Sequence, residues 1–176
     1  KPVIVLVCSF CHDEPIETFL SAAANITDQF SLLVTGKKSK AGSLLRFESD
    51  KIHFLDYLPN EQYDWLISNC DLMVVLTTND DCLVCGAYEA TRIHCPVLLS
   101  DTDVLRETFP FALYSKTSKK DYQLAIKDFL TNSAAYKTKA ATFEKEFEVI
   151  WENQFKKVRD TLNIPNQVDA NTSDEN

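Results

Sequence analysis

Glycine is scarce in this sequence, which has 3 glycines in 176 residues. The G-x-G-x-x-G loop of dinucleotide-binding enzymes and the G-x-x-x-x-G-K-[ST] loop of many NTPases both need clustered glycines. Neither pattern occurs in the chain. The sequence therefore gives no signal for a dinucleotide-dependent oxidoreductase or a P-loop NTPase. A nucleophile-elbow glycine pattern is also missing, which argues against a serine hydrolase.

Basic charge and long apolar runs are scarce as well. The chain has 18 Lys and Arg against 26 Asp and Glu, a formal net charge of -8. Because nucleic-acid backbones are bound by clustered Lys and Arg, we expect no nucleic-acid partner. The longest strongly apolar stretches, residues 3–7 and 72–76, are too short to cross a bilayer. No basic-then-apolar signal segment opens the chain, so we predict a cytoplasmic protein.

The composition that remains is that of a globular domain, with 45% hydrophobic and 25% charged residues. A chain of 176 residues is long enough for one sizeable core. We place this domain at residues 1–163 and interpret the polar, acidic residues 164–176 as a disordered tail. The chain begins with Lys1 rather than Met, and we expect it to be part of a longer protein.

Six apolar, β-branched runs of strand length alternate with segments of helical spacing. The runs are residues 3–7, 31–35, 52–55, 72–76, 97–99 and 111–114. Strands that are apolar on both faces and separated by amphipathic helices predict a parallel sheet covered on both sides. The expected fold class is therefore α/β, a Rossmann-like doubly wound parallel sheet of about six strands.

The spacing of apolar residues becomes helical throughout after Phe129. We expect one long C-terminal helix there, with an apolar stripe that packs in the core or against another domain rather than on a membrane surface. The stripe comprises Phe143, Phe147, Ile150, Trp151, Phe155, Val158 and Leu162. In doubly wound folds ligands bind beyond the carboxyl ends of the strands, so residues with a chemical role are expected in the loops that follow them.

Three segments carry a resemblance to a known family: residues 52–59, residues 69–72 and residues 81–90. They resemble the second domain of retaining glycosyltransferases of the GT-B fold, especially family 4. Those enzymes have a strand ending in Phe-Leu-Gly, a helix ending before Ala-Asp and a further strand, and two acidic residues followed by Pro-Val. Here the acidic pair is Asp81 and Glu89, with seven residues between them, and Pro96-Val97 follows. The similarity covers roughly residues 3–130.

The resemblance implies the nucleotide-sugar-binding half of a GT-B enzyme that transfers a hexosyl group, with retention, to a glycan or lipid-linked acceptor. The donor would be a UDP- or GDP-linked sugar, and no further cofactor or metal is implied. The N-terminal acceptor domain would be missing, so we expect this chain to be incomplete and inactive alone. For a lipid-linked acceptor we expect the longer protein to associate peripherally with a membrane.

The same resemblance assigns the candidate site residues. The catalytic candidates are Asp81, near the transferred sugar, and Glu89, whose carboxylate would accept hydrogen bonds from the ribose hydroxyls. Backbone N–H groups at the start of the helix that begins near Cys85 and Gly86 would face the diphosphate. The remaining donor-binding candidates follow the first three strands: Ser9, Gly36, Lys37 and Tyr57. Lys37 and Lys38 could supply positive charge to a phosphate, and the alternative is that they belong to a solvated turn with Gly36.

The sequence departs from the family pattern at two positions that matter for charge. The family offers an Arg just after the first strand and a Lys a few residues later, where this chain has Ser9 and Glu14. Losing two cations beside a departing diphosphate would remove several kcal/mol of transition-state stabilisation. An alternative is therefore a catalytically degenerate binding or scaffolding domain. A weaker alternative is a protein similar to sugar-nucleotide epimerases.

Two C-x-x-C pairs, Cys8 with Cys11 and Cys82 with Cys85, follow strands that are expected to be neighbours. Four converging thiolates would suit a tetrahedral zinc ion. The pairs are far apart in sequence, however, and cysteine is often a small buried hydrophobe. We therefore interpret these cysteines as small buried side chains and predict no metal site.

Overall fold

The computed structural model describes residues 1–162, with six parallel strands in one sheet. The end of the predicted domain at residue 163 and the predicted tail lie outside the described residues. The strands are β1 (Val3–Leu6), β2 (Ser31–Thr35), β3 (Ile52–Asp56), β4 (Leu72–Val75), β5 (Val97–Ser100) and β6 (Leu113–Ser115). Their order is β3-β2-β1-β4-β5-β6, and every neighbouring pair is parallel. The predicted Rossmann-like doubly wound sheet is confirmed.

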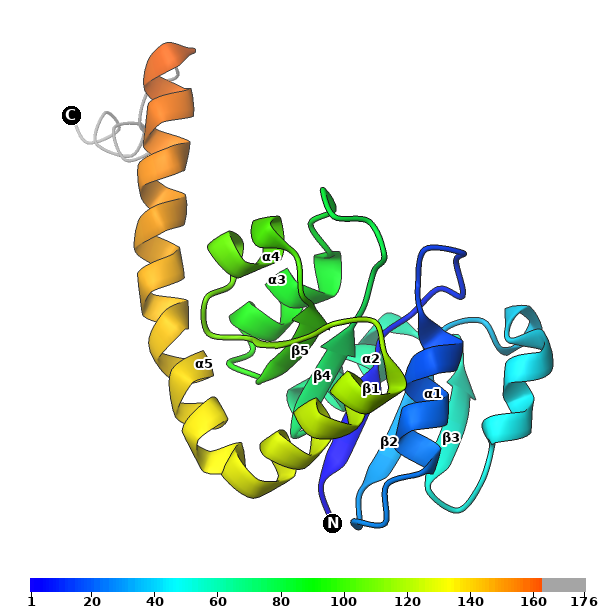
Figure 1. Cartoon of the computed structure of the whole chain (residues 1–176). Coiled ribbons are helices and arrows are strands. Elements are labelled where there is room, and N and C mark those ends of the chain that lie inside the picture. Colours follow the sequence, from blue (N-terminus) through cyan, green and yellow to red (C-terminus); the bar gives the residue numbers. More distant parts are fainter. Residues whose placement is uncertain (163–176) are drawn as a thin grey trace.

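Helices cover both faces of this sheet (Figure 1). The helices are α1 (Ile16–Ala24), α2 (Asn60–Ser68), α3 (Cys85–Arg92), α4 (Asp103–Thr108) and α5 (Lys119–Thr161), with short 3-10 helices η1 (Lys38–Lys40) and η2 (Gly42–Phe47). The strands alternate their apolar side chains between two cores. Val74 packs with α1 and the first part of α5, whereas Met73 and Val75 pack with α2, α3 and α4.

The sixth strand lies later in the sequence than predicted. The expected run was 111–114, but β6 pairs with β5 only from Leu113 onward. Phe111 is buried in the connection before β6 and stacks on Phe143 of α5, with 4.8 Å between the ring centroids. Its apolar character therefore reflects packing against a helix and not strand pairing.

Helix α5 begins at Lys119, eleven residues before the predicted helical stretch, which starts after Phe129. Ser118 caps it by accepting a hydrogen bond from the Asp121 N–H at 3.1 Å. Its first part packs on α1 through Tyr122 and other buried side chains. Asn132 has non-helical backbone angles (φ -115°, ψ 22°), and the helix bends there, passes under the sheet and rises along its other face (Figure 1).

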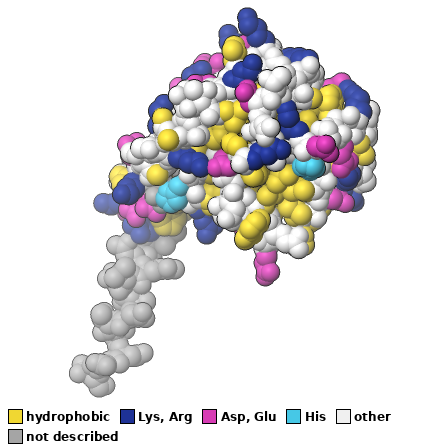
Figure 2. Space-filling model, turned by 90° about the horizontal axis from the view of Figure 1, so that it is seen from below, with side chains coloured by type: hydrophobic (Ala, Val, Ile, Leu, Met, Phe, Trp, Pro, Cys, Tyr) yellow, Lys and Arg dark blue, Asp and Glu magenta, His cyan; other side chains and the backbone are white. Residues whose placement is uncertain are grey.

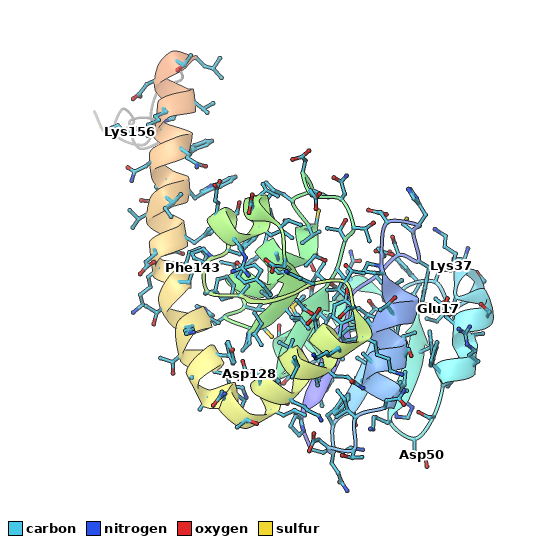
Figure 3. All side chains as sticks on the ribbon, viewed as in Figure 1. Glu17, Lys37, Asp50, Asp128, Phe143 and Lys156 are labelled. Atoms are coloured by element: carbon cyan, nitrogen blue, oxygen red, sulfur yellow. The ribbon has the colours of Figure 1, made fainter. Side chains whose placement is uncertain are left out.

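Beyond this bend, only the first part of the predicted apolar stripe is packed. Phe143 points toward the domain (Figure 3) and is buried, and Phe147 packs beside it. The last turns project away from the domain (Figure 1). The exposed fractions there range from 47% to 61% for Ile150, Trp151, Phe155, Val158 and Leu162. Of the two predicted roles of the stripe, packing in the core is wrong for these five residues. Packing against another domain stays a prediction.

None of the helices within residues 1–162 combines the length and the apolarity that a membrane span requires.

Candidate ligand-binding site

The strand order reverses beside β1, which lies between β2 and β4. Loops that leave neighbouring strands in opposite directions open a crevice at this point. Here the loops after β1 and β4 are tied together. The Asp13 carbonyl accepts hydrogen bonds from the Thr78 N–H at 2.7 Å and from the Thr78 hydroxyl at 3.0 Å. The crevice is thus built from loops that hold each other in place.

A cavity of about 680 Å³ lies at the carboxyl ends of β1, β2 and β3 and reaches α2 and α3. This volume is in the range of small-molecule sites. Figure 3 places Lys37, after β2, at this end of the molecule, whereas Asp50, before β3, lies at the opposite end. The lining residues are Val7, Cys8, Ser9, Thr35, Gly36, Lys37, Lys40, Tyr57, Leu58, Asn60, Tyr63, Asp64 and Glu89.

Glu89 of α3 is held at the cavity wall by Tyr63 of α2. The Tyr63 hydroxyl donates a hydrogen bond to Glu89 Oε2 at 2.6 Å. Burial and this bond to a carboxylate raise the pKa of Tyr63, so the hydroxyl keeps its proton and remains a donor. Among the described residues, Glu89 Oε1 has no hydrogen-bond partner. The carboxylate is thus oriented by the protein while one oxygen remains available to a ligand.

Two lysines give the cavity its positive charge. Lys37 and Lys40 both line it, and both side chains are exposed. Lys38, between them, instead forms an ion pair with Glu48, with 3.1 Å between Nζ and Oε2. The alternation follows from the 3-10 turn η1, which brings Lys37 and Lys40 to the same side. Lys40 was not among the site residues predicted from the sequence.

Gly36 lets the loops after β1 and β2 approach each other closely. Its φ is +102°, and a Cβ built on it would lie 2.3 Å from the Cys8 carbonyl oxygen. Any side chain would therefore collide with backbone, and the left-handed conformation adds strain. Sequence analysis assigned Gly36 to ligand binding. Its lack of a side chain is explained by its place in the cavity wall, where the loops after β1 and β2 meet.

Asp56, at the end of β3, organises the next loop. Its φ is +66°, and its carboxylate Oδ1 accepts hydrogen bonds from the Lys38 and Tyr57 N–H groups, each at 2.8 Å. These backbone bonds, first that of Lys38, lower the pKa of Asp56. The carboxylate thereby fixes Tyr57, whose side chain is 73% exposed at the cavity. An exposed ring at a cavity offers a flat apolar surface for stacking.

The loop after β1 carries its own carboxylate. The Ser9 N–H donates to both oxygens of Glu14, at 3.0 and 3.1 Å, and the Cys11 N–H donates to Oε2 at 2.8 Å. The Ser9 hydroxyl lies 3.2 Å from Oε1. Between these residues Phe10 has φ +60°, and its ring stacks on Phe54 with 6.3 Å between centroids. Ser9 lines the cavity, but its N–H is already bonded within the chain, and its role in donor binding stays a prediction.

Three predicted site residues lie outside the cavity lining. Asp81 is exposed in the loop between β4 and α3, where its N–H donates to Asn79 Oδ1 at 3.1 Å. Cys85 is the exposed first residue of α3. Gly86 is buried, and a Cβ there would lie 2.8 Å from Val75 Cγ2. This glycine therefore allows α3 to pack closely on β4.

The structure brings together Ser9, Gly36, Lys37, Tyr57 and Glu89, all of which line the one cavity. Sequence analysis missed Tyr63 because its spacing with Leu66 and Ile67 indicated a residue on the packing face of a helix. Asn60 and Asp64, on the same helix, also line the cavity. Asn60 is the first residue of α2, directly after a strand and its loop, and this position is the signal that could have found it.

The four cysteines of the two C-x-x-C pairs do not assemble. Within residues 1–162 no group of three or more His, Cys, Asp or Glu could hold a metal ion. Cys11 and Cys85 are exposed, so the prediction of buried side chains was wrong for them. Cys8 is half-buried and donates to the Thr35 carbonyl at 3.1 Å; burial, together with nearby Glu14, raises its pKa to about 12. The Cys8 thiol is thus held in its neutral form.

The opposite end of the sheet has mixed charge. Seen from below, Lys and Arg side chains are interspersed with acidic ones and with apolar patches (Figure 2). Nucleic-acid backbones bind to continuous basic surfaces. This face offers none.

No protein-family profile matches the sequence, and no curated protein matches it. Solved structures do. Sucrose-phosphate synthase from Thermosynechococcus elongatus matches with a TM-score of 0.77 and 21% identity, over 92% of this chain and 45% of that one. The Anabaena protein HepE in complex with UDP matches with a TM-score of 0.76 and 15% identity, over 92% of this chain and 48% of that one.

A third match is an α,α-trehalose-phosphate synthase (UDP-forming) from Burkholderia vietnamiensis, with a TM-score of 0.70 and 10% identity, over 92% of this chain and 45% of that one. The chain thus spans less than half the length of these three structures. At such identities the likeness shows the fold alone and does not single out family 4. The chain has the fold of one Rossmann-like half of the GT-B glycosyltransferases.

Proposed function

We propose that this chain is the donor-binding domain of a retaining glycosyltransferase that moves a hexosyl group from a nucleoside-diphosphate sugar to a glycan or lipid-linked acceptor. The observation that carries the proposal is Glu89, presented by Tyr63 on the wall of a cavity that Lys37 and Lys40 also line. A carboxylate with a free oxygen accepts hydrogen bonds from ribose hydroxyls, and two lysines offset diphosphate charge.

The other parts of the cavity suit the remaining portions of such a donor. Tyr57 offers an exposed ring on which a base would stack. HepE, whose fold is similar, is described in complexes with UDP and with UDP-glucose. We assign Asp81 and the amides of Cys85 and Gly86 to the sugar and the diphosphate on the strength of the family resemblance. Retention of configuration rests on the same resemblance.

Calorimetric titration with UDP and GDP tests the proposal. We expect saturable binding to at least one of them, weakened by Glu89→Gln, which keeps the side-chain volume but removes the charge. Glu107→Gln is the matched control, because Glu107 is an exposed glutamate on α4 outside the cavity lining. Absence of binding to both nucleotides at millimolar concentration, or equal effects of the two substitutions, would contradict the proposal.

A second candidate is a binding or scaffolding domain that retains the donor cavity without transfer activity. It is favoured by Glu14, a negative charge on the loop after β1 where the related enzymes have cations. Such a domain would bind UDP or GDP as above. A longer protein that contains this chain would then show no sugar transfer, whereas transfer abolished by Glu89→Gln in a folded variant would exclude this candidate.

We further infer that, in a longer protein that contains this chain, an acceptor-binding domain packs on the exposed stripe of α5. Monomeric domains rarely expose contiguous apolar surface of this kind, and the chain covers less than half of the structures with the same fold. The fluorescence of Trp151 reports on whether this stripe is covered. The measurement uses a Trp65→Phe background, because Trp65 is also exposed. We expect iodide to quench Trp151 in this chain and to quench it much less in a longer protein. Equal quenching in both would contradict the inference.

A further inference from the structure

The loop after β1 has the geometry of an anion-binding site. In the segment 9–11, the N–H groups of Ser9 and Cys11 converge on one point, and Phe10 between them has the positive φ (+60°) of a backbone nest. Such concavities of backbone N–H groups bind phosphate and other anions. The position of the anion is already taken by Glu14, which receives three N–H···O contacts from these two residues.

Within residues 1–162, no cationic side chain forms an ion pair with Glu14. The carboxylate is held by backbone N–H groups and lies near the Ser9 hydroxyl, and it is half-buried. It therefore occupies the loop as an internal substitute for an anionic ligand. Because Ser9 lines the cavity together with Lys37 and Lys40, an anion bound in the nest would lie beside those lysines.

The nest is supported by contacts that do not involve Glu14. The Phe10 ring stacks on Phe54 and packs against the core, and the Asp13 carbonyl accepts two hydrogen bonds from Thr78. Gly36 packs against the Cys8 carbonyl. The loop is consequently expected to keep its shape when the Glu14 carboxylate leaves.

We propose that Glu14 is a displaceable internal anion that closes a diphosphate subsite in the loop after β1 and so limits the affinity for nucleoside diphosphates. A diphosphate and the Glu14 carboxylate are both negative and need the same N–H groups, so they exclude each other. Removing the carboxylate frees at least two N–H donors and eliminates one negative charge that would repel the diphosphate. The identification of the ligand as a nucleotide rests on the proposed function; the anion subsite itself does not.

The test is calorimetric titration of wild type, Glu14→Gln and Glu14→Ala with UDP, uridine and inorganic pyrophosphate. We expect both variants to bind UDP and pyrophosphate at least about tenfold more tightly than wild type, which corresponds to about 1.4 kcal/mol. Uridine, which has no phosphate, should be unaffected. Glu17→Gln is the matched control, because it removes the same charge three residues later, from an exposed pair with Arg46.

The outcomes separate this inference from the proposed function. Tighter pyrophosphate binding with no UDP binding by any protein would support the subsite and reject the nucleotide. Unchanged or weaker binding of both UDP and pyrophosphate by folded Glu14 variants would overturn the inference, as would an equal gain in Glu17→Gln. If both Glu14 variants fail to fold, the amide NMR signals of wild type decide: pyrophosphate must shift those of Ser9 and Cys11, and leaving them unchanged would overturn the inference.

Discussion

Gly36 provides a sharp test of how the cavity is built, because the chain contains a natural control. Gly36 and Gly42 both have positive φ, +102° and +53°. A Cβ at Gly36 would lie 2.3 Å from the Cys8 carbonyl oxygen, whereas a Cβ at Gly42 meets nothing within 4 Å. The two alanine substitutions therefore share the backbone strain but differ in the collision.

The expected magnitudes follow from this difference. Gly42→Ala places alanine in the left-handed region, which costs about 1 kcal/mol. Gly36→Ala carries a comparable strain from its positive φ and must also push the loop after β1 away from β2. We expect Gly36→Ala to lower the free energy of unfolding by at least about 2 kcal/mol more than Gly42→Ala does.

Urea denaturation of the two variants measures their free energies of unfolding. UDP titration of the same samples measures the affinity of the cavity for UDP. Gly36→Ala should weaken UDP binding even where the protein remains folded, and Gly42→Ala should not. Equal losses of stability in the two variants would show that the close approach at Cys8 is not a constraint, and would refute this account of the cavity wall.

Three further predictions concern single side chains. Tyr63→Phe removes the hydroxyl that orients Glu89 and should cost about 1–2 kcal/mol of unfolding free energy and weaken UDP binding; unchanged affinity would show that this bond does not position the carboxylate. Burial alone would raise the pKa of Asp71, but the hydrogen bonds that it accepts from α5 and β1 lower this pKa below the ordinary value of 3.8. The ionised carboxylate therefore stabilises the folded protein above pH 3.8, and this stabilisation is lost as the pH falls through the pKa of Asp71 in the folded state. Asp71→Asn should therefore destabilise the protein at pH 7 by no more than about 1 kcal/mol, with a difference from wild type that disappears in acid denaturation; a constant difference would contradict this. Phe143→Ala should cost about 3–5 kcal/mol because this ring is buried against the domain, whereas Phe155→Ala should stay within about 0.5 kcal/mol; thermal unfolding would contradict the assignment if the two were equal.

The doubly wound parallel sheet was predictable from sequence for a physical reason. Apolar runs of strand length, such as 72–76, indicate strands that are buried on both faces. A doubly wound sheet brings the carboxyl ends of such strands to one edge. Residues directly after these strands, such as Gly36 and Tyr57, line the cavity, and their role in donor binding stays a prediction. Glu89 was located through family resemblance and not through periodicity.

The parts that sequence did not predict depend on contacts between elements. The bond from Tyr63 to Glu89 requires that α2 and α3 lie side by side, which no local pattern indicates. The bonds from the loop to Glu14 require a positive φ at Phe10, a residue type that rarely adopts it. The packing of Phe143 and the exposure of Phe155 differ because the domain ends between them, although both continue one stripe.

We propose above all that the cavity beneath the loops after β1, β2 and β3 binds the nucleoside diphosphate of a sugar donor. A crystal structure of the chain with UDP tests it most directly. We expect ribose hydroxyls within hydrogen-bond distance of the Glu89 carboxylate and the base beside Tyr57. The diphosphate should lie between Lys37, Lys40 and the loop after β1. UDP bound elsewhere, with Glu89 still contacting only Tyr63, would contradict it.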